Sequence, residues 1–594
     1  MNIPVKNILN IEKDKSAVCL TLTGSTVKEM IRLLDLNKNY IQLAELRLDL
    51  LDGSERENAF EIIEYGIPLI LTVRKISDGG RWGANPGEND CERDKLIYKY
   101  LEYGKSGIKF VDLEYGCSMQ ESEKYIKNKL SDSLKIIRSF HSFRGGLLET
   151  DFSKIRNMIK DISRNGEIPK IALMCTGSSD LQLLCSLSET VADVKEKILL
   201  GMGEYGVPSR ILSAKFGSLW TYASDGADAP APGQLSAGEL VKLYRFNKLS
   251  ASDPVFCVTG NPVAHSKSPE IHNNWLGKYG LKGTYIKIPS DNFDDFLNTA
   301  ECLGIKGISV TVPHKEKALT SSGDSDTLSK QIGAANTLVE KPELNIIPDG
   351  SRRGRNRREK RKWYAYNTDA AGFLADFAAG LVQKPVFHPG NVSVSTKTVS
   401  TKTMETGFSS VLPESENTVN LLESAASLLK DYRGAKALII GAGGAARAAA
   451  SALAYAGIKL IILNRTKEKA KILAESFGGE WGPLSPESLP LIEKGINFVV
   501  QTTTVGMISH AGDTSAEYTD GSQRQQHLTV SDDPVPWWIP PENLYAYDMV
   551  YVPEETAFLH KVKAAGGKTR NGKGMLLSQA VLQFKLFTGI MPES

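Results

Sequence analysis

The sequence is poor in several features that mark common classes of protein. It has seven cysteines in 594 residues, an odd number, and none of them stand in a C-x-x-C pattern. We therefore expect neither a disulfide framework nor a zinc site, and predict reduced, mostly buried thiols. No apolar run is long and uncharged enough to predict a membrane span.

The sequence also lacks an excess of one charge. A formal net charge of +2 gives no global attraction to nucleic acid or to a membrane surface. The first residues, MNIPVKNILNIEKDK, have neither an apolar signal core nor the Arg- and Ser-rich pattern of a transit peptide. We expect a cytoplasmic protein with no nucleic-acid or membrane partner. Its length predicts three or four domains.

The stretch from Ala435 to Thr466 predicts a dinucleotide-binding unit. It opens with an apolar run, Ala437–Ile440, which suits a buried parallel strand. Gly441, Gly443 and Ala446 then form a G-x-G-x-x-A motif at the start of an alanine-rich helix. The first glycine permits a tight turn, the second lets the backbone approach a pyrophosphate, and the small third residue lets helix and strand pack closely. A transmembrane helix or a chance glycine cluster is the alternative, and the order strand, turn, helix, strand argues against both.

The residues after the second strand of this unit indicate which dinucleotide it binds. The strand Lys459–Leu463 ends in Asn464, Arg465 and Thr466. Folds that bind NAD usually carry a carboxylate about 20 residues after the glycines, which holds the ribose 2′-OH. Here an amide and a guanidinium take that place and suit a 2′-phosphate, so the sequence predicts NADP(H). A dinucleotide fold alone does not name a reaction.

Short apolar runs alternate with helical patterns through the first part of the chain. Helical stretches such as Val27–Leu36 and Phe152–Ile162 lie between the runs. The eight runs are Ala17–Thr23, Glu45–Leu51, Pro68–Arg74, Lys109–Glu114, Lys135–His141, Pro169–Cys175, Lys197–Met202 and Ser218–Ala223. Eight strand–helix alternations over about 240 residues predict a (β/α)8 TIM barrel, whose active site lies at the carboxyl ends of the strands.

Polar side chains near those strand ends form a candidate site. They are Glu45, Arg47, Arg74, His141, Lys170 and Arg210. A lysine in a buried strand, such as Lys170, is costly unless it is used. Desolvation and cationic neighbours would lower the pKa of its amine and free it to form a Schiff base with a ketone. His141 ends the neighbouring strand, where it could move protons near that imine. Each residue alone has a structural alternative, but the set of six favours a site.

These residues stand in motifs that resemble type I 3-dehydroquinate dehydratase. In the family's order they are E-L-R-L-D-L (45–50), L-T-V-R (71–74), S-F-H (139–141), P-K-I-A (169–172), S-R-I-L (209–212) and A-P-G-Q (231–234). The resemblance implies that Lys170 is the Schiff-base lysine and His141 the general acid and base. It also implies a set of substrate ligands supported by Glu45, namely Arg47, Arg74, Arg210 and Gln234. The chain departs from the family at Asp78, where a glutamate is usual, and at Pro230, where a serine is frequent.

The second half offers two further pairs of residues. Ser266 and Ser268 stand in a loop bounded by glycine and proline and could hold a carboxylate, although a solvated turn is the plainer reading. A strand predicted at Gly307–Pro313 leads to Lys315, and a later strand leads to Asp369. From the pattern alone, Lys315 and Asp369 fit a proton-transfer pair and a surface salt bridge equally well.

This half resembles shikimate dehydrogenase. The motifs N-P-V-A-H-S-K-S-P, V-T-V-P-H-K-E, G-A-A-N-T, N-T-D, G-A-G-G-A, N-R-T, T-V-G-M, Y-D-M-V-Y and G-M-L-L-S-Q occur in the family's order. The resemblance implies that Lys315 and Asp369 are the catalytic pair and that Ser266 and Ser268 hold the substrate carboxylate. Implied ligands of the substrate hydroxyls are Thr311, Asn336, Tyr551 and Gln579. Implied cofactor ligands are Gly441, Ala442, Gly443, Gly444, Ala445, Asn464, Arg465, Thr466, Lys469 and Gly574. Gln501 and Asn571-Gly-Lys573 depart from the family's usual Asn and Asp-Gly-Leu.

The resemblances and composition shifts together predict the domain organisation. A basic run, SRRGRNRREKRKW, and a Ser/Thr-rich run, NVSVSTKTVSTKT, are read as loop insertions without chemical motifs. The predicted segments are a barrel (1–247), a substrate-binding domain (254–382, with a basic insertion at 341–362), a Ser/Thr-rich insertion (383–432), an NADP-binding Rossmann domain (433–566, with an insertion at 508–541) and a C-terminal segment (567–594) that returns to the substrate domain.

We therefore expect a bifunctional enzyme that dehydrates 3-dehydroquinate and reduces 3-dehydroshikimate to shikimate with NADPH. A preference of the second unit for quinate is one rival reading. A metabolite-sensing regulator with silent sites, whose basic loop touches nucleic acid, is the other. Retention of Lys170, His141, Lys315 and Asp369 argues against a regulator. The sequence leaves the oligomeric state open.

Overall fold

The computed structural model describes most of the chain and divides it into two compact units. The described residues are 4–593 except 58, 86, 104–106, 118–121, 123, 125–133, 146–148, 227–230, 342–362, 383–415, 494 and 508–531. The units are Met1–Ile305 and Lys306–Ser594. Pro230, the basic run, the Ser/Thr-rich run and most of the third insertion lie outside the described residues.

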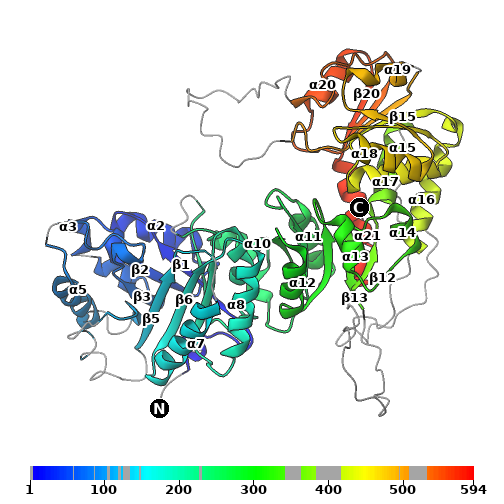
Figure 1. The fold of residues 1–594 in the computed structure, drawn as a ribbon. Coiled ribbons are helices and arrows are strands. Elements are labelled where there is room, and N and C mark those ends of the chain that lie inside the picture. The colour runs from blue at the N-terminus through cyan, green and yellow to red at the C-terminus, as the bar shows by residue number, and fades with distance from the viewer. Residues whose placement is uncertain are drawn as a thin grey trace, which may run out of the picture. The chain divides into compact units, whose positions relative to one another are not determined.

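The first unit contains the predicted barrel (Figure 1). Its parallel strands are β1 (Ala17–Leu22), β2 (Leu43–Arg47), β3 (Leu69–Thr72), β4 (Ile108–Glu114), β5 (Lys135–Ser142), β6 (Ile168–Met174), β7 (Ile198–Met202) and β8 (Trp220–Ala223). Each strand pairs with the next from β1 to β7, and β8 pairs with β1. At the remaining seam, Leu219 N donates to Lys197 O at 2.9 Å, so the barrel is nearly closed. The predicted fold class is confirmed.

Helices connect the barrel strands and cover them. They are α1 (Val5–Ile8), α2 (Val27–Asn37), α3 (Gly53–Arg56), α4 (Phe60–Glu64), α5 (Asp90–Tyr103), α7 (Glu149–Arg164), α8 (Ser178–Thr190), α9 (Val207–Ile211) and α10 (Ala237–Lys242). The start of α2 is fixed by a capping box, in which Thr26 and Glu29 each accept a backbone N–H of the other residue. Val5 and Leu9 pack among apolar residues from the starts of the strands, such as Phe110 and Trp220. This cluster fills the end of the barrel opposite the carboxyl ends of the strands.

Several of the predicted strands end earlier than expected. The run Glu45–Leu51 is a strand only as far as Arg47, after which Leu48–Leu50 form a 3-10 turn. The turn places Asp49 against the Arg47 guanidinium, with N–O distances of 2.9 and 2.7 Å. The run Gly307–Pro313 is a strand only as far as Val310, and Pro313, which has no N–H, could not have extended it.

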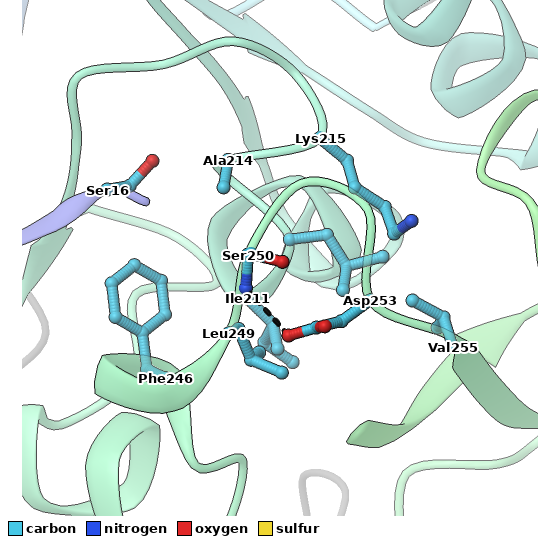
Figure 2. A pocket seen from close by; sticks show the side chains of 10 residues that line it. Ser16, Ile211, Ala214, Lys215, Phe246, Leu249, Ser250, Asp253 and Val255 are labelled. Atoms are coloured by element: carbon cyan, nitrogen blue, oxygen red, sulfur yellow. Dashed lines mark hydrogen bonds between the residues drawn. The ribbon is translucent and has the colours of Figure 1, made fainter. Parts of the chain in front are cut away.

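The first unit continues into a small parallel strand pair, β9 (Val255–Gly260) and β10 (Thr284–Pro289), with α11 (Ser268–Lys278) and α12 (Phe293–Cys302). Figure 2 shows the junction, where Phe246, Leu249 and the barrel residue Ile211 line a small pocket. Asp253 Oδ2 accepts the backbone N–H of Ser250 at 2.9 Å and closes the connecting turn. The connecting turn is therefore closed by its own hydrogen bond, and Ile211 of the barrel lies beside it.

The second unit contains two groups of strands. β11 (Ile305–Val310), β13 (Thr337–Glu340), β14 (Trp363–Tyr366) and β12 (Asp324–Ser325) pair in that order. The other strands form a six-stranded parallel Rossmann sheet in the order β17 (Glu480–Pro483), β16 (Lys459–Asn464), β15 (Lys436–Ile440), β18 (Phe498–Gln501), β19 (Tyr545–Asp548) and β20 (Lys568–Asn571).

The helices of the second unit link its two groups of strands. They are α13 (Lys315–Ser321), α14 (Thr327–Ile332), α15 (Asp369–Val382), α16 (Glu416–Leu428), α17 (Gly444–Tyr455), α18 (Lys467–Phe477), α19 (Leu489–Ile492), α20 (Ala557–Ala564) and α21 (Lys573–Thr588). α15 packs against α16, α17 and α21. Along this contact the small side chains of α15 and α17 let the helix backbones approach closely. No helix within the described part of the chain is long and apolar enough to cross a membrane.

Candidate functional sites

The candidate residues of the barrel gather around one cavity. Its lining includes Glu45, Arg47, Arg74, His141, Lys170, Arg210 and Gln234, together with Asp78 and Tyr222. These residues come from the carboxyl-terminal parts of several strands and from the loops that follow. The sequence analysis proposed the first seven, and the structure brings all seven to the same cavity.

A buried ionic network holds the amine of Lys170. Its Nζ lies 2.8 Å from Asp112 Oδ2 and 3.5 Å from Glu45 Oε1, and 4.2 Å from the centroid of the Tyr222 ring. Arg74 Nη2 binds the same Asp112 oxygen at 2.8 Å. Although burial opposes it, the cationic charges of Arg74 and Lys170 hold the pKa of Asp112 well below its usual range. The amine is thus oriented by carboxylates, and the guanidinium of Arg74 on the same Asp112 oxygen is its cationic neighbour.

His141 lies beside this network in a form that can accept a proton. Burial lowers its pKa well below 6.5, and the charges of Arg74 and Lys170 lower it further. Its Nδ1 is buried without a hydrogen-bond partner and lies 4.0 Å from Asp78 Oδ1. The imidazole is therefore neutral at pH 7, with an aspartate near one ring nitrogen.

Arg210 brings an uncompensated cation to the cavity. Its Nε is buried and has no hydrogen-bond partner, and its Nη2 lies 3.4 Å from the carbonyl of Pro232. Burial lowers the pKa of Arg210 to about 10, so the guanidinium stays charged at neutral pH. A buried charge without a counter-ion is costly, and an anionic ligand would offset that cost.

Other polar groups of the cavity are tied together. Glu45 accepts hydrogen bonds from Thr21 Oγ1 at 3.3 Å and Thr72 Oγ1 at 3.1 Å. Gln234 Nε2 donates to the same Thr21 hydroxyl at 3.3 Å. The cavity thus offers donors and acceptors in fixed positions for a small polyhydroxylated anion.

Asp112 is a functional residue that the sequence reasoning missed. It stands in the middle of the run K-F-V-D-L-E, two residues before the end of β4. A fully buried carboxylate in an otherwise apolar strand is a signal of the same kind as the buried Lys170, and it could have been found in the same way.

The second unit brings Lys315 and Asp369 together. Lys315 Nζ lies 2.6 Å from Asp369 Oδ2, and both residues begin helices, α13 and α15, that follow strands. Asn336 Nδ2 donates to Asp369 Oδ1 at 2.8 Å and lies 3.3 Å from Gln579 Oε1. Four of the candidate residues therefore form one connected network. Because both charged side chains are largely buried, a surface salt bridge is excluded for this pair.

The glycine motif has the geometry that a pyrophosphate requires. Gly441 follows β15 with a φ of +114°, a conformation that side chains disfavour. A Cβ on Gly443 would meet nothing within 4 Å, which leaves open space before the N-terminus of the twelve-residue helix α17. A Cβ on Gly444 would lie 3.0 Å from Lys315 Cδ. The turn fits a dinucleotide and lies directly beside the proposed proton donor.

The remaining candidates lie in loops and at the starts of helices of the two units. Arg465 and Thr466 are exposed just after β16 and Lys469 is exposed in the first turn of α18, while Ala442 lies in the glycine turn and Ala445 in the first turn of α17. In the first unit, Ser266 and Ser268 are hydrogen-bonded to each other through their hydroxyls at 3.2 Å. Thr311 follows β11, Tyr551 follows β19, and Gly574 lies in the first turn of α21.

Gln501, one of the departures from the family pattern, is built into the loop after β18. Its side-chain amide donates to the carbonyls of Thr503 and Val505, both at 3.1 Å. The side chain is fully buried. It therefore fixes the shape of the loop that follows β18.

Together these two sites define a bifunctional enzyme. The site in the barrel is that of an imine-forming lyase, and the site in the second unit is that of a dehydrogenase that uses a phosphorylated dinucleotide. Three family models match in the corresponding places. They are type I 3-dehydroquinase over residues 18–251, the shikimate dehydrogenase substrate-binding domain over 258–338 and shikimate/quinate 5-dehydrogenase over 423–518.

The chain is also similar to individual proteins. A chloroplastic bifunctional 3-dehydroquinate dehydratase/shikimate dehydrogenase of Arabidopsis thaliana is 28% identical over 98% of this chain and 83% of its own length. An NADP(+)-dependent shikimate dehydrogenase of Bacillus licheniformis is 31% identical over 57% of this chain and 93% of its own length. A solved dehydroquinate dehydratase and shikimate dehydrogenase of S. pombe is 21% identical, covers 98% of this chain and 97% of its own, and superposes with a TM-score of 0.35.

The chain belongs to the bifunctional family that joins a type I 3-dehydroquinase to a shikimate dehydrogenase. It combines a 3-dehydroquinate dehydratase with an NADP-dependent shikimate dehydrogenase of the shikimate pathway. The prediction of the two activities and of the cofactor is thereby confirmed.

Proposed function

We propose that the barrel dehydrates 3-dehydroquinate through an imine on Lys170 and that the second unit reduces the product at Lys315 and Asp369. The convergence of all seven predicted barrel residues on one cavity is the observation that carries the barrel assignment. Domain boundaries and residue roles remain proposals. So does a cytoplasmic location, which fits the seven free thiols.

In the first step, the Lys170 amine attacks the C3 ketone of 3-dehydroquinate and water leaves, which gives an iminium. The iminium withdraws electrons from the neighbouring carbon, so the C2 proton becomes acidic. Asp112 and Glu45 hold the amine in place on the cavity floor before the attack. Because the carbon–nitrogen bond is the electron sink, this chemistry needs no metal ion.

His141 then takes the C2 proton and returns a proton to the departing C1 hydroxyl, which leaves as water. The low pKa of His141 keeps the ring neutral and able to accept that first proton. Asp78 lies near Nδ1 and would stabilise the imidazolium that forms. Hydrolysis of the imine releases 3-dehydroshikimate and restores Lys170.

Arg210 is our choice for the substrate carboxylate, since it is the buried guanidinium with an unpaired Nε. Arg47 is already bound to Asp49 on two sides, and Arg74 to Asp112. These two arginines, with Gln234 and Glu45, would bind the hydroxyls and fix the orientation of the ring. The carboxylate would also compensate the charge of Arg210.

In the second unit, NADPH supplies the hydride that reduces the ketone of 3-dehydroshikimate. Lys315 donates a proton to the oxygen of that former ketone, and Asp369 orients the ammonium group. Asn336, Gln579, Thr311 and Tyr551 would bind the ring hydroxyls, and Ser266 and Ser268 the carboxylate. The product is shikimate.

The cofactor would lie along the glycine turn and the end of β16. Gly441 to Ala445 would hold the pyrophosphate with backbone N–H groups at the start of α17. Arg465 and Lys469, with Asn464 and Thr466, would bind the 2′-phosphate. Gly574 would lie near the nicotinamide ring.

The experiment uses the purified full-length enzyme with 3-dehydroquinate. Enone absorbance is followed first, and NADPH is then added and its oxidation recorded. We expect Lys170→Ala to abolish the first signal and Lys315→Ala only the second, so each variant is the control for the other. Borohydride reduction during turnover should attach the substrate to Lys170.

Two outcomes would change the assignment. Oxidation of NADPH by 3-dehydroquinate in the Lys170→Ala variant, where no enone forms, would show a quinate-type dehydrogenase. Binding of both ligands without turnover in the unmodified enzyme would favour a metabolite-sensing regulator.

A further inference from the structure

Helices α8 and α12 pack against each other in the first unit (Figure 1), and hydrogen bonds join α8 to Asp291, just before α12, and to Cys302, at its end. At the start of α8, the N–H and hydroxyl of Ser178 donate to Asp291 Oδ1 at 3.1 and 2.7 Å. At the far end, the thiol of Cys302 donates to Glu189 Oε1 at 3.3 Å. Both contacts join residues 113 apart in the sequence. Since all α-helices rise equally per residue, α8 and α12 run parallel and in register.

This register places two thiols together. Cys185 precedes Glu189 by one helical turn and therefore lies on the same face of α8. A hydrogen bond with the Cys302 thiol, together with burial, raises the pKa of Cys185. Cys185 is 1% exposed, whereas Cys302 is only partly buried at the last position of α12. The partly exposed thiol of Cys302, which lies against Glu189, is thus within one helical turn of the buried Cys185 on the facing helix.

Neither thiol belongs to the two catalytic sites described above, and the pair joins two domains. α8 directly follows β6, the strand that carries Lys170. α12 belongs to the segment that begins the dehydrogenase half, after β9 and β10. A covalent bond between these helices would fasten the barrel to the following domain.

We propose that Cys185 and Cys302 form a reversible redox modification site that takes a small-molecule disulfide such as oxidised glutathione. The Cys302 thiol loses its proton, for which the Glu189 carboxylate is the adjacent acceptor, and the thiolate attacks one sulfur of the disulfide. One glutathione thiolate leaves, and Cys302 carries the other glutathione as a mixed disulfide.

Cys185 completes the reaction. Its sulfur attacks the Cys302 sulfur of the mixed disulfide and expels the second glutathione as a thiolate, which takes up the proton that the Cys185 thiol loses. Two protein thiols are oxidised to one disulfide, one glutathione disulfide is reduced to two thiols, and excess dithiol reverses both steps. The disulfide reduces the conformational entropy of the unfolded chain, so the unfolding midpoint of the first unit should rise by about 5 °C on oxidation.

The test treats the full-length enzyme with oxidised or reduced glutathione and analyses its peptides without reduction. We expect the oxidised enzyme to lose two of its seven thiols and to yield a peptide pair joined through Cys185 and Cys302. Cys185→Ser should stop the reaction halfway, so that Cys302 retains one glutathione. Cys302→Ser should leave Cys185 as a free thiol.

Cys91→Ser is the matched control, since Cys91 is an exposed cysteine at the start of α5. It should form the Cys185–Cys302 bond as the unmodified enzyme does and show the same rise in the unfolding midpoint. Oxidised protein that lacks the joined peptides, or that keeps glutathione on Cys302 while Cys185 is present, would overturn the proposal. Both catalytic activities, measured in the same samples, report whether the variants are folded.

Discussion

Replacing Asp112 by asparagine tests whether a buried carboxylate positions the Schiff-base lysine. Asp112 is fully buried and binds Lys170 and Arg74 through the same oxygen, at 2.8 Å each. Asparagine keeps the shape but removes the charge, which leaves two buried cations next to each other. Removing one partner of a buried ion pair costs about 3–5 kcal/mol. Loss of about 3 kcal/mol in the transition state corresponds to a fall of roughly 100-fold in rate.

The assay is the dehydratase kcat/KM of Asp112→Asn from enone absorbance, with shikimate dehydrogenase activity measured in the same sample. We expect the first to fall by about 100-fold and the second to stay unchanged, because Lys315 and Asp369 lie in the other compact unit. Borohydride trapping should also slow, since imine formation depends on the position of the amine.

The matched control is Glu167→Gln, which removes the charge of another carboxylate from an arginine pair in the same barrel. Glu167 binds Arg138 at 2.7 and 2.8 Å and does not line the cavity. It should lower the stability of the barrel and leave the dehydratase rate nearly unchanged. A dehydratase rate in Asp112→Asn equal to that of the control would refute the positioning role.

Four further outcomes follow from the geometry. Gly443→Ala should raise the KM for NADPH by about tenfold, because the added Cβ would meet the pyrophosphate. The unfolding midpoint should not change, because that Cβ would meet no protein atom within 4 Å. Arg465→Ala should raise the KM for NADPH by about tenfold and leave the KM for NADH nearly unchanged in steady-state assays, since the variant loses only a contact to the 2′-phosphate. The dehydratase kcat/KM should stay level from pH 8 to 6, because burial and two cations lower the pKa of His141 well below 6.5, and a fall that begins near pH 7 would contradict this. Burial raises the pKa of Asp548 to about 7, so between about pH 4 and 7 the folded state keeps a proton that the unfolded chain releases. The free energy of unfolding therefore falls as the pH rises through this range. Asp548→Asn should remove this fall, as measured by urea titrations at pH 5 and 8.

The sequence predicts the elements better than it predicts their connections. All eight barrel strands lie where the apolar runs indicate, because a strand buried on both faces needs a continuous run of apolar residues. The run through Leu51 overshoots β2, since an apolar pattern cannot show that the Arg47–Asp49 pair requires a turn. Local pattern sets the strands, whereas polar pairing decides where some of them end.

The candidate residues show the same division. Lys170 and His141 are found by their position in apolar strands, but the nearest charge to Lys170 comes from Asp112, 58 residues earlier in the chain. Likewise, the Lys315–Asp369 pair is left at even odds by the sequence, because burial decides between a salt bridge at the surface and a catalytic pair. Such contacts arise from tertiary packing and leave no mark in local spacing.

The network around Asn336 has a consequence for the order in which the two sites can form. Asn336 contacts Gln579, 243 residues later and close to the end of the chain, whereas the barrel cavity is complete by Gln234. During synthesis the domains nearest the N-terminus generally fold first. Once the barrel has emerged from the ribosome, the growing chain can therefore already contain a formed dehydratase site. The dehydrogenase network must wait until Gln579 has been made, so a chain cut short just before Gln579 would retain the first activity and lack the second.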